Sequence, residues 1–363
     1  MRIEEIQTVC FVGAGTMGCY NSIVAAVSGY DVVLYDIDKD TLDQAPERHE
    51  EFSAMLVAHS YCTQDAISQA VQRISFAANL EQATANADLV SESIVERLDI
   101  KRAVHQELDQ VCPGSTILTT NSSMLLVSDI EDVVGRGDRF AALHSHLGSP
   151  LVDIVGGPRT SAATIEILNR YVLSTGGVPL LLKKEYPGYI LNAMLGPLLG
   201  AAMLMVSEGA ATIQEVDRAW MRHCNAPMGP FGMIDLFGLN LIYDTWQYRE
   251  EDPATADRRS KILALLQPFI DAGELGMKSA RGFYQYPDPG YQHADFLDDA
   301  ANDTASYSAL ITAVVGNAVL VAAHDVAEPN DIDRAWMTGT YLEAGPFAIL
   351  AQLGTTAFLA ILA

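Results

Sequence analysis

Short apolar runs alternate with longer amphipathic stretches over the first half of the chain. Residues 8–12 and 31–36 form the first two runs, and both are rich in residues that favour strands. The remaining runs lie at residues 88–90, 116–119, 139–143 and 178–182. Helical patterns fill most of the intervals, and a long polar helical stretch between residues 40 and 70 extends one of them. Such alternation predicts βαβ units and a mostly parallel sheet.

The pattern changes after Pro187, where strand signals fade and helix formers with apolar faces take over. We therefore expect a Rossmann-type α/β N-terminal domain at residues 1–186, followed by an all-α C-terminal domain. Within the helical part, residues 215–221 (EVDRAWM) recur as residues 331–337 (DIDRAWM), and Gly-Pro-Phe at 229–231 recurs at 345–347. The constant spacing predicts an internal helical repeat. It divides the C-terminal part into a substrate or dimerisation unit at 187–290 and a truncated second copy at 291–363.

An apolar run at residues 189–206 approaches the length of a membrane span. It contains Asn192, two glycines and a proline, and no basic flank follows it. We expect a buried helix in a core or a subunit interface. The run predicts a homodimer through the helical domain, or a monomer if the second helical copy covers the same face.

Charge and cysteine content narrow the classes of function. The 363 residues include 46 acidic and 22 basic side chains, a formal net charge of −24. Nucleic-acid binders need a basic face, so this balance argues against them, and it disfavours anionic membranes as well. The five cysteines are scattered and odd in number, which favours reduced thiols and a cytoplasmic location. The N-terminus is too acidic for a signal peptide, and no histidine or cysteine spacing predicts a metal site.

A glycine-rich motif follows the first strand run. Gly13, Gly15 and Gly18 form a GxGxxG pattern that opens a helical stretch, with Thr16 and Met17 inside it. In this context the first glycine permits a tight turn, the second admits a pyrophosphate and the third allows helix and strand to pack closely. The second strand run ends at Asp36, whose carboxylate can accept hydrogen bonds from a ribose diol. Carboxylates at this point would repel a 2′-phosphate, so the sequence predicts NAD rather than NADP.

Together with further motifs, the glycine motif makes the chain resemble the L-3-hydroxyacyl-CoA dehydrogenase family over almost its whole length. The resemblance is carried by ADLVSESIVE at 87–96 with Lys101, TNSS at 120–123, PGYILN at 187–192, PMGPF at 227–231 and LGMKSARGFY at 275–284. It implies a small-molecule substrate, NAD as cofactor and a place in fatty acid metabolism. It also implies oxidation of a 3-hydroxyl group, with hydride loss to the nicotinamide while a histidine removes the proton.

The resemblance also implies roles for particular residues. The strand run RFAALH matches the family and places His144 as the general base, with Asp153 as the carboxylate that orients it. Ser123 and Asn192 would contact the substrate. Glu96 and Lys101 would lie near the nicotinamide end of the cofactor.

The catalytic loop departs from the family pattern, and this leaves alternatives open. The family's Asn-Pro pair is missing, and Asp153 replaces a glutamate about three residues early. The loop is therefore shortened, and His146 becomes a rival base. An NAD-binding relative with impaired catalysis is a further alternative.

The substrate also remains open. The stretch at 41–75, where the family's CoA-contacting helices fall, has only Arg48 and Arg73 as fixed positive charges. Phosphates favour such charges, so a free hydroxy acid, such as a sugar acid or a carnitine-like compound, stands beside a 3-hydroxyacyl thioester.

Overall fold

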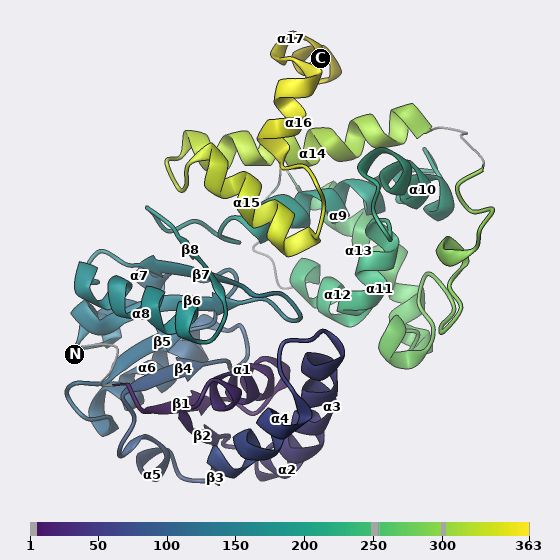
Figure 1. Cartoon of the computed structure of the whole chain (residues 1–363). Coiled ribbons are helices and arrows are strands. Elements are labelled where there is room, and N and C mark those ends of the chain that lie inside the picture. Colours follow the sequence, from purple (N-terminus) through teal and green to yellow (C-terminus); the bar gives the residue numbers. More distant parts are fainter. Residues whose placement is uncertain (1–5, 248–252, 254, 299–302, 363) are drawn as a thin grey trace. The chain divides into compact units, whose positions relative to one another are not determined.

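The computed structural model describes residues 6–247, 253, 255–298 and 303–362. The chain forms two compact units. The first extends to Ile190 and includes the later segment His324–Asp331, and the second comprises Leu191–Ala323 and Ile332–Ala363. Figure 1 shows strands flanked by helices in the first unit and helices in the second.

The first unit is built on one eight-stranded sheet with the order β3-β2-β1-β4-β5-β6-β7-β8. Its strands are β1 (Thr8–Val12), β2 (Asp31–Tyr35), β3 (Ile74–Ala77), β4 (Leu89–Glu92), β5 (Ile117–Thr120), β6 (Phe140–Ser145), β7 (Leu151–Gly156) and β8 (Val178–Leu181). Neighbouring strands are parallel except at β6 and β7, which pair antiparallel. The order 3-2-1-4-5-6 is that of a Rossmann fold, and ligands bind at the carboxyl ends of such strands.

Helices cover the sheet. They are α1 (Thr16–Val27), α2 (Lys39–Asp43), α3 (Ala45–Ala58), α4 (Gln64–Ala70), α5 (Leu80–Thr84), α6 (Leu98–Val111), α7 (Val127–Ile130) and α8 (Ala162–Ser174). Short 3₁₀ turns occupy Val71–Arg73, Glu131–Val133 and Gly137–Arg139. The core beneath α1, α3 and α8 contains alternate residues of the strands, such as Val9 and Phe11 of β1.

The predicted runs all fall on strands, and the polar stretch at 40–70 forms α2 to α4. Strands β3 and β7 were not predicted from the sequence. Strand β3 lies at the sheet edge with two of its four residues exposed, so it lacks an apolar run. Strand β7 returns antiparallel through a short hairpin, which the expected βαβ alternation does not include.

The second unit is helical. Its helices are α9 (Leu191–Ser207), α10 (Ile213–Cys224), α11 (Pro230–Phe237), α12 (Leu239–Gln247), α13 (Ala256–Ala272), α14 (Asp303–Ala323), α15 (Pro329–Thr340), α16 (Pro346–Leu353) and α17 (Thr355–Leu362). The first three residues of α15 belong to the first unit. Two 3₁₀ turns lie at Met277–Ser279 and Gly290–Gln292.

The apolar run at 189–206 forms α9, which packs along α14 of the same chain. Met194, Leu198 and Met203 are buried in α9, and Leu310 and Val314 are buried in α14. Helix α14 is long and apolar enough to cross a membrane by length and composition. Core helices of soluble proteins meet the same criteria, and α14 also packs against α10 and α16.

Each of the two stretches of the predicted repeat has an aspartate that caps the following helix in the same way. Asp217 of α10 accepts hydrogen bonds from the amides of Phe231 and Gly232 at the start of α11, at 2.8 and 3.1 Å. Asp333 of α15 accepts from the corresponding amides at the start of α16, at 2.8 and 3.0 Å. The rings of Trp220 and Trp336 meet edge to face, 6.3 Å apart. Duplication of one unit stays our interpretation of this likeness.

The expected boundaries differ from the compact units. The first compact unit ends at Ile190, where Tyr189 packs against the end of β6, and the expected domain boundary at 186 stays a prediction. Residues 191–298 and 303–323 belong to one unit rather than two, since α14 packs on α9. The return of His324–Asp331 to the first unit was not predicted.

Candidate active site

A glycine-rich loop joins β1 to α1. Gly13 has a φ of +104°, which only glycine adopts readily. A Cβ on Gly18 would lie 1.7 Å from the carbonyl oxygen of Gly13, so the loop and helix can pack only without a side chain there. No atom lies within 4 Å of the Cβ position of Gly15, which leaves room at the N-terminus of α1. The residues fit a dinucleotide pyrophosphate, which would meet the amides of the first turn, at Thr16 and Met17.

Asp36 follows β2 and lies beside this loop. One carboxylate oxygen accepts a hydrogen bond from the amide of Ala14 at 2.7 Å, and the other accepts from the amide of Asp38 at 2.9 Å. Arg48 of α3 donates to the carbonyl of Ala14 at 2.6 Å. These bonds fix the carboxylate next to the glycine turn, where the family pattern requires a ribose partner. Its contact with the ribose stays a prediction.

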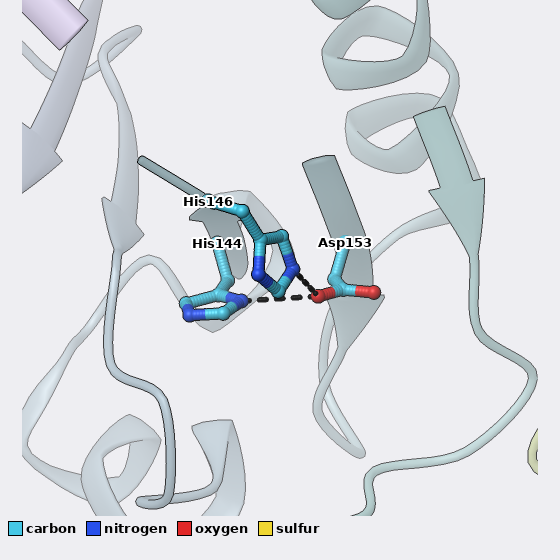
Figure 2. Close-up of side chains that lie close together, drawn as sticks. All are labelled: His144, His146 and Asp153. Carbon is cyan, nitrogen blue, oxygen red and sulfur yellow. Dashed lines mark hydrogen bonds and ion pairs between the residues drawn. The ribbon is translucent and has the colours of Figure 1, made fainter. Parts of the chain in front are cut away.

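The hairpin of β6 and β7 carries the predicted base and its carboxylate. The antiparallel register places His144 directly opposite Asp153. His144 Nδ1 lies 3.0 Å from Asp153 Oδ2, and His146 Nε2 lies 2.8 Å from the same oxygen (Figure 2). Asp153 is fully buried, and His144 is 3% exposed. Both candidate bases therefore share one carboxylate, an arrangement that the sequence analysis did not foresee.

Ser123 lies on the other side of the His144 ring. Its hydroxyl oxygen is 3.0 Å from His144 Nε2, the nitrogen that Asp153 does not contact. The two predicted residues are thus brought together with the histidine between them. A substrate hydroxyl group placed near Ser123 would also come close to Nε2 of His144.

Tyr189 was not predicted as a site residue. Its ring stacks on the ring of His144, with centroids 4.8 Å apart, and its hydroxyl donates to the carbonyl of Ser122 at 2.7 Å. The family resemblance at 187–192 predicted Asn192 as the site residue of that motif. An aromatic residue two positions after a proline in that motif was the available signal.

Glu96 holds the loop that carries Ser123. One of its oxygens accepts hydrogen bonds from the Ser122 hydroxyl and from the amides of Ser123 and Met124, the latter two at 3.0 and 2.9 Å. The carboxylate therefore fixes the position of the serine. Contact with the nicotinamide, which the resemblance implied, stays a prediction.

Lys101 lies in a buried network rather than on the surface. It is 1% exposed, and its ammonium group lies 2.5 Å from Glu92 and 3.6 Å from Glu96. His105 Nε2 and the Thr120 hydroxyl contact the other Glu92 oxygen at 3.1 and 2.9 Å. Lys101 therefore forms an ion pair with Glu96 inside the first unit. Its expected contact with the cofactor stays a prediction. The four-residue spacing of Lys101 and His105 on one helix face was the signal for this network.

The charges at the site follow from burial and hydrogen bonding. Burial, and secondarily His146, lower the pKa of His144, while the hydrogen bond to Asp153 opposes them. Burial would raise the pKa of Asp153, but hydrogen bonds from both imidazoles outweigh it and lower that pKa. The pKa of Glu92 falls to about 2, because Lys101 and His105 overcome the cost of burial. The histidine is therefore neutral and the carboxylates are ionised near neutral pH.

Asn192 lies in the first turn of α9, in the second unit, and its contact with substrate stays a prediction.

The cluster of His144, His146 and Asp153 also consists of residue types that bind metal ions. The nearest nitrogens and oxygens of the three side chains lie within 4.8 Å of one another. The two hydrogen bonds already explain the short spacing, and our expectation of no metal is not tested.

Comparison with known proteins identifies the family of the chain. Residues 8–186 match the 3-hydroxyacyl-CoA dehydrogenase NAD binding domain, and residues 188–286 match the C-terminal domain of the same family. A 3-hydroxybutyryl-CoA dehydrogenase of Bradyrhizobium diazoefficiens is 31% identical over 284 residues, which cover 77% of this chain and 96% of that protein.

Solved structures give the same result. A diketoreductase, described for its substrate-directed dual catalysis of dicarbonyl compounds, has a TM-score of 0.71 and 34% identity, covering 77% of this chain and 99% of that one. The 3-hydroxybutyryl-CoA dehydrogenase of Escherichia coli shares the fold over 98% of this chain and 93% of that one, with a TM-score of 0.78 and 23% identity. The chain belongs to the 3-hydroxyacyl-CoA dehydrogenase family of NAD-dependent oxidoreductases.

Proposed function

We propose that this protein interconverts a short-chain 3-hydroxyacyl-CoA and its 3-keto form, with His144 as the general base. One observation carries the proposal. Asp153 holds Nδ1 of His144, and the opposite nitrogen faces the Ser123 hydroxyl at 3.0 Å. An ionised carboxylate can only accept hydrogen bonds, so Nδ1 carries the hydrogen and donates it, while Nε2 keeps its lone pair.

The chain's own residues account for the proton. Nε2 of His144 takes the proton of the substrate hydroxyl, and the imidazolium that forms is stabilised by Asp153. Ser123 donates a hydrogen bond to the reacting oxygen, and Glu96 keeps Ser123 in place through the loop amides. Asn192 is the second proposed contact with the substrate. NAD, when bound along the glycine loop beside Asp36, accepts hydride from the carbon that bears the hydroxyl group.

The relatives support the substrate class. The bacterial relative at 31% identity is named for 3-hydroxybutyryl-CoA, so a short acyl chain is the first substrate to assay. The free hydroxy acids considered from the sequence are the comparison substrates, because they lack the thioester and its carrier.

The test combines two variants with two measurements. Turnover of 3-hydroxybutyryl-CoA with NAD is followed at 340 nm, and NAD affinity is measured by calorimetry. We expect H144Q to lower kcat by about 10³-fold or more while NAD affinity is retained, since only the proton acceptor is lost. D36A should weaken NAD binding by about tenfold through loss of the ribose contact.

Several outcomes would contradict the proposal. If H144Q keeps the activity of the natural chain, His144 is not the base. Turnover of a free hydroxy acid, but not of the thioester, would replace the substrate class. NAD binding without turnover of any substrate would indicate the impaired relative instead.

The assembly and location are also proposals. We propose a monomer rather than the homodimer first expected, because α14 of the same chain covers the apolar face of α9. The cytoplasmic location is supported by five cysteines that form no disulfide.

A further inference from the structure

The second histidine of the hairpin lies on the same face as the first. His144 lies in β6, and His146 directly follows Ser145, the last residue of that strand. Successive side chains of an extended chain point to opposite faces, so Ser145 points away from the side on which both rings contact Asp153. The hydroxyl of Ser145 donates to Asn21 and Asn121, at 2.8 and 3.1 Å. The register of the hairpin places Asp153 of β7 directly opposite His144, where its carboxylate contacts both rings.

Asp153 depends on these two rings for its hydrogen bonds. Its Oδ2 is contacted by His144 Nδ1 at 3.0 Å and by His146 Nε2 at 2.8 Å. Its Oδ1 is buried and has no hydrogen-bond partner among the described residues. Figure 2 shows Oδ1 directed away from both rings. With His146 removed, a single hydrogen bond would have to hold a buried carboxylate in the orientation that serves the base.

The hairpin of this chain has a particular need for such a second donor. Asp153 is one methylene shorter than the glutamate of the family pattern, and the loop before it is shortened. A shorter acid reaches the base only from the strand position directly opposite it. His146 Nε2–H points at the same oxygen from beyond the base, and its ring packs edge to face on His144 with centroids 4.5 Å apart.

We propose that His146 is a positioning residue for the dehydrogenase reaction, which holds Asp153 so that Nδ1 of His144 stays protonated and Nε2 stays free. The inference rests on the proposed role of His144 as the base. His144, and not His146, is the proposed base, because the Ser123 hydroxyl lies 3.0 Å from the second nitrogen of the His144 ring.

His146 also affects the charge of the base. The titratable groups facing His144 in the described part of the first unit are Asp153 of β7, His146 just after β6, Glu96 before α6 and Tyr189 after β8. Both carboxylates raise the pKa of His144, whereas His146 lowers it. Without His146, the Asp153 carboxylate would accept a hydrogen bond from His144 alone and would stabilise the charged form of that ring more strongly. Both changes move the acid limb of the pH profile toward higher pH.

The experiment compares H146Q with H146L, both assayed with 3-hydroxybutyryl-CoA and NAD after treatment with EDTA. Glutamine places an amide N–H where Nε2–H of histidine was, but it does not titrate. We expect H146L to lower kcat by about tenfold and H146Q to recover most of that loss. We expect the acid limb of kcat/KM to move to higher pH in both variants. H59Q, at the exposed histidine that follows α3, is the matched control.

The outcomes separate this inference from the proposed function. Equal losses in H146Q and H146L, with an unmoved acid limb, would mean that the ring only fills space and would overturn the inference. A loss in H146L as large as that of H144Q would instead make His146 the base. If H144Q itself remains active, the proposed function fails first. Loss of activity after EDTA treatment of the natural chain would replace the hydrogen-bonded cluster with a metal site and overturn the inference.

Discussion

At the scale of single residues, short hydrogen bonds from distant segments decide which atoms are available for chemistry. His144 shows this most clearly, because Asp153 and Ser123 contact its two nitrogens from different strands and loops. Glu96 fixes Ser123 from a third segment. The motifs identified these residues, but they could not show which nitrogen each partner contacts.

A buried histidine away from the site provides a test of stability against pH. His49 of α3 is 4% exposed, and Nε2 lies 2.8 Å from the Ser22 hydroxyl. Burial lowers its pKa to about 4 from an ordinary 6.5. The unfolded chain therefore binds more protons, and the stabilisation present above pH 6.5 is lost as the pH falls toward 4.

We expect H49Q to reduce this acid sensitivity, since glutamine keeps a donor for Ser22 and does not titrate. The free energy of unfolding, measured by urea titration at pH 7 and pH 5, should fall by about 2 kcal/mol less in H49Q than in the natural chain. H59Q, at an exposed histidine, should leave the difference unchanged. An equal fall in H49Q would mean that His49 accepts a proton without unfolding.

At the scale of elements, the sequence predicts the strands that are marked by regular apolar runs. It does not predict the elements that form only through pairing with another segment. Strand β7 follows a five-residue loop at 146–150, and its central Asp153 interrupts the apolar run. Only pairing with β6 makes Leu151–Gly156 a strand. The network of Glu92, Lys101 and His105 was missed for a similar reason, since it forms between the end of β4 and a face of α6.

The two aspartate caps of the helical unit test the likeness between its stretches. Asp217 is fully buried, whereas Asp333 is partly exposed. Removal of the Asp333 carboxylate leaves two amides without their acceptor, at a site that water can reach. Removal of the Asp217 carboxylate leaves two buried amides and the Tyr284 hydroxyl without theirs. We expect D217A to lower the free energy of unfolding by about 2 kcal/mol and D333A by about 1 kcal/mol, measured by thermal and urea denaturation. Equal effects would mean that burial does not distinguish the two caps.

The helical insert α2 to α4 gives a prediction about the carrier. Both fixed positive charges of residues 41–75 are already engaged, because Arg48 donates to Ala14 and Arg73 pairs with Asp31 at 3.1 Å. The insert therefore offers few charges to CoA phosphates. We expect kcat/KM for the N-acetylcysteamine thioester of 3-hydroxybutyrate to lie within about tenfold of the CoA thioester. A loss of about a thousandfold would show strong phosphate recognition elsewhere in the protein.

At the scale of the whole molecule, the second helical stretch provides the partner that the first requires. Helix α9 has an apolar face that would be exposed without α14, and α14 supplies buried side chains along it. The sequence could predict that this face is covered, but it could not decide between a second chain and a later segment of the same chain. That choice depends on contacts between helices that are far apart in sequence.

Light scattering after size exclusion tests the proposed monomer. We expect a mass near 39.2 kDa at micromolar concentrations. Twice that mass, unchanged on dilution, would favour the dimer first expected from the sequence. Activity measured over the same range of concentrations should be proportional to protein, because each chain would carry its own complete helical unit.

The return of His324–Asp331 to the first unit has a practical consequence for how the protein can be divided. The carbonyl of Val326 accepts from the amide of Lys183 just beyond β8 at 2.8 Å, and the side chain of Lys183 pairs with Asp325 at 3.3 Å. A gene fragment that stops at Ile190 would therefore encode a nucleotide-binding half without its last piece. Stable halves would have to be made by circular rearrangement or by co-expression, because no single cut in the chain separates them.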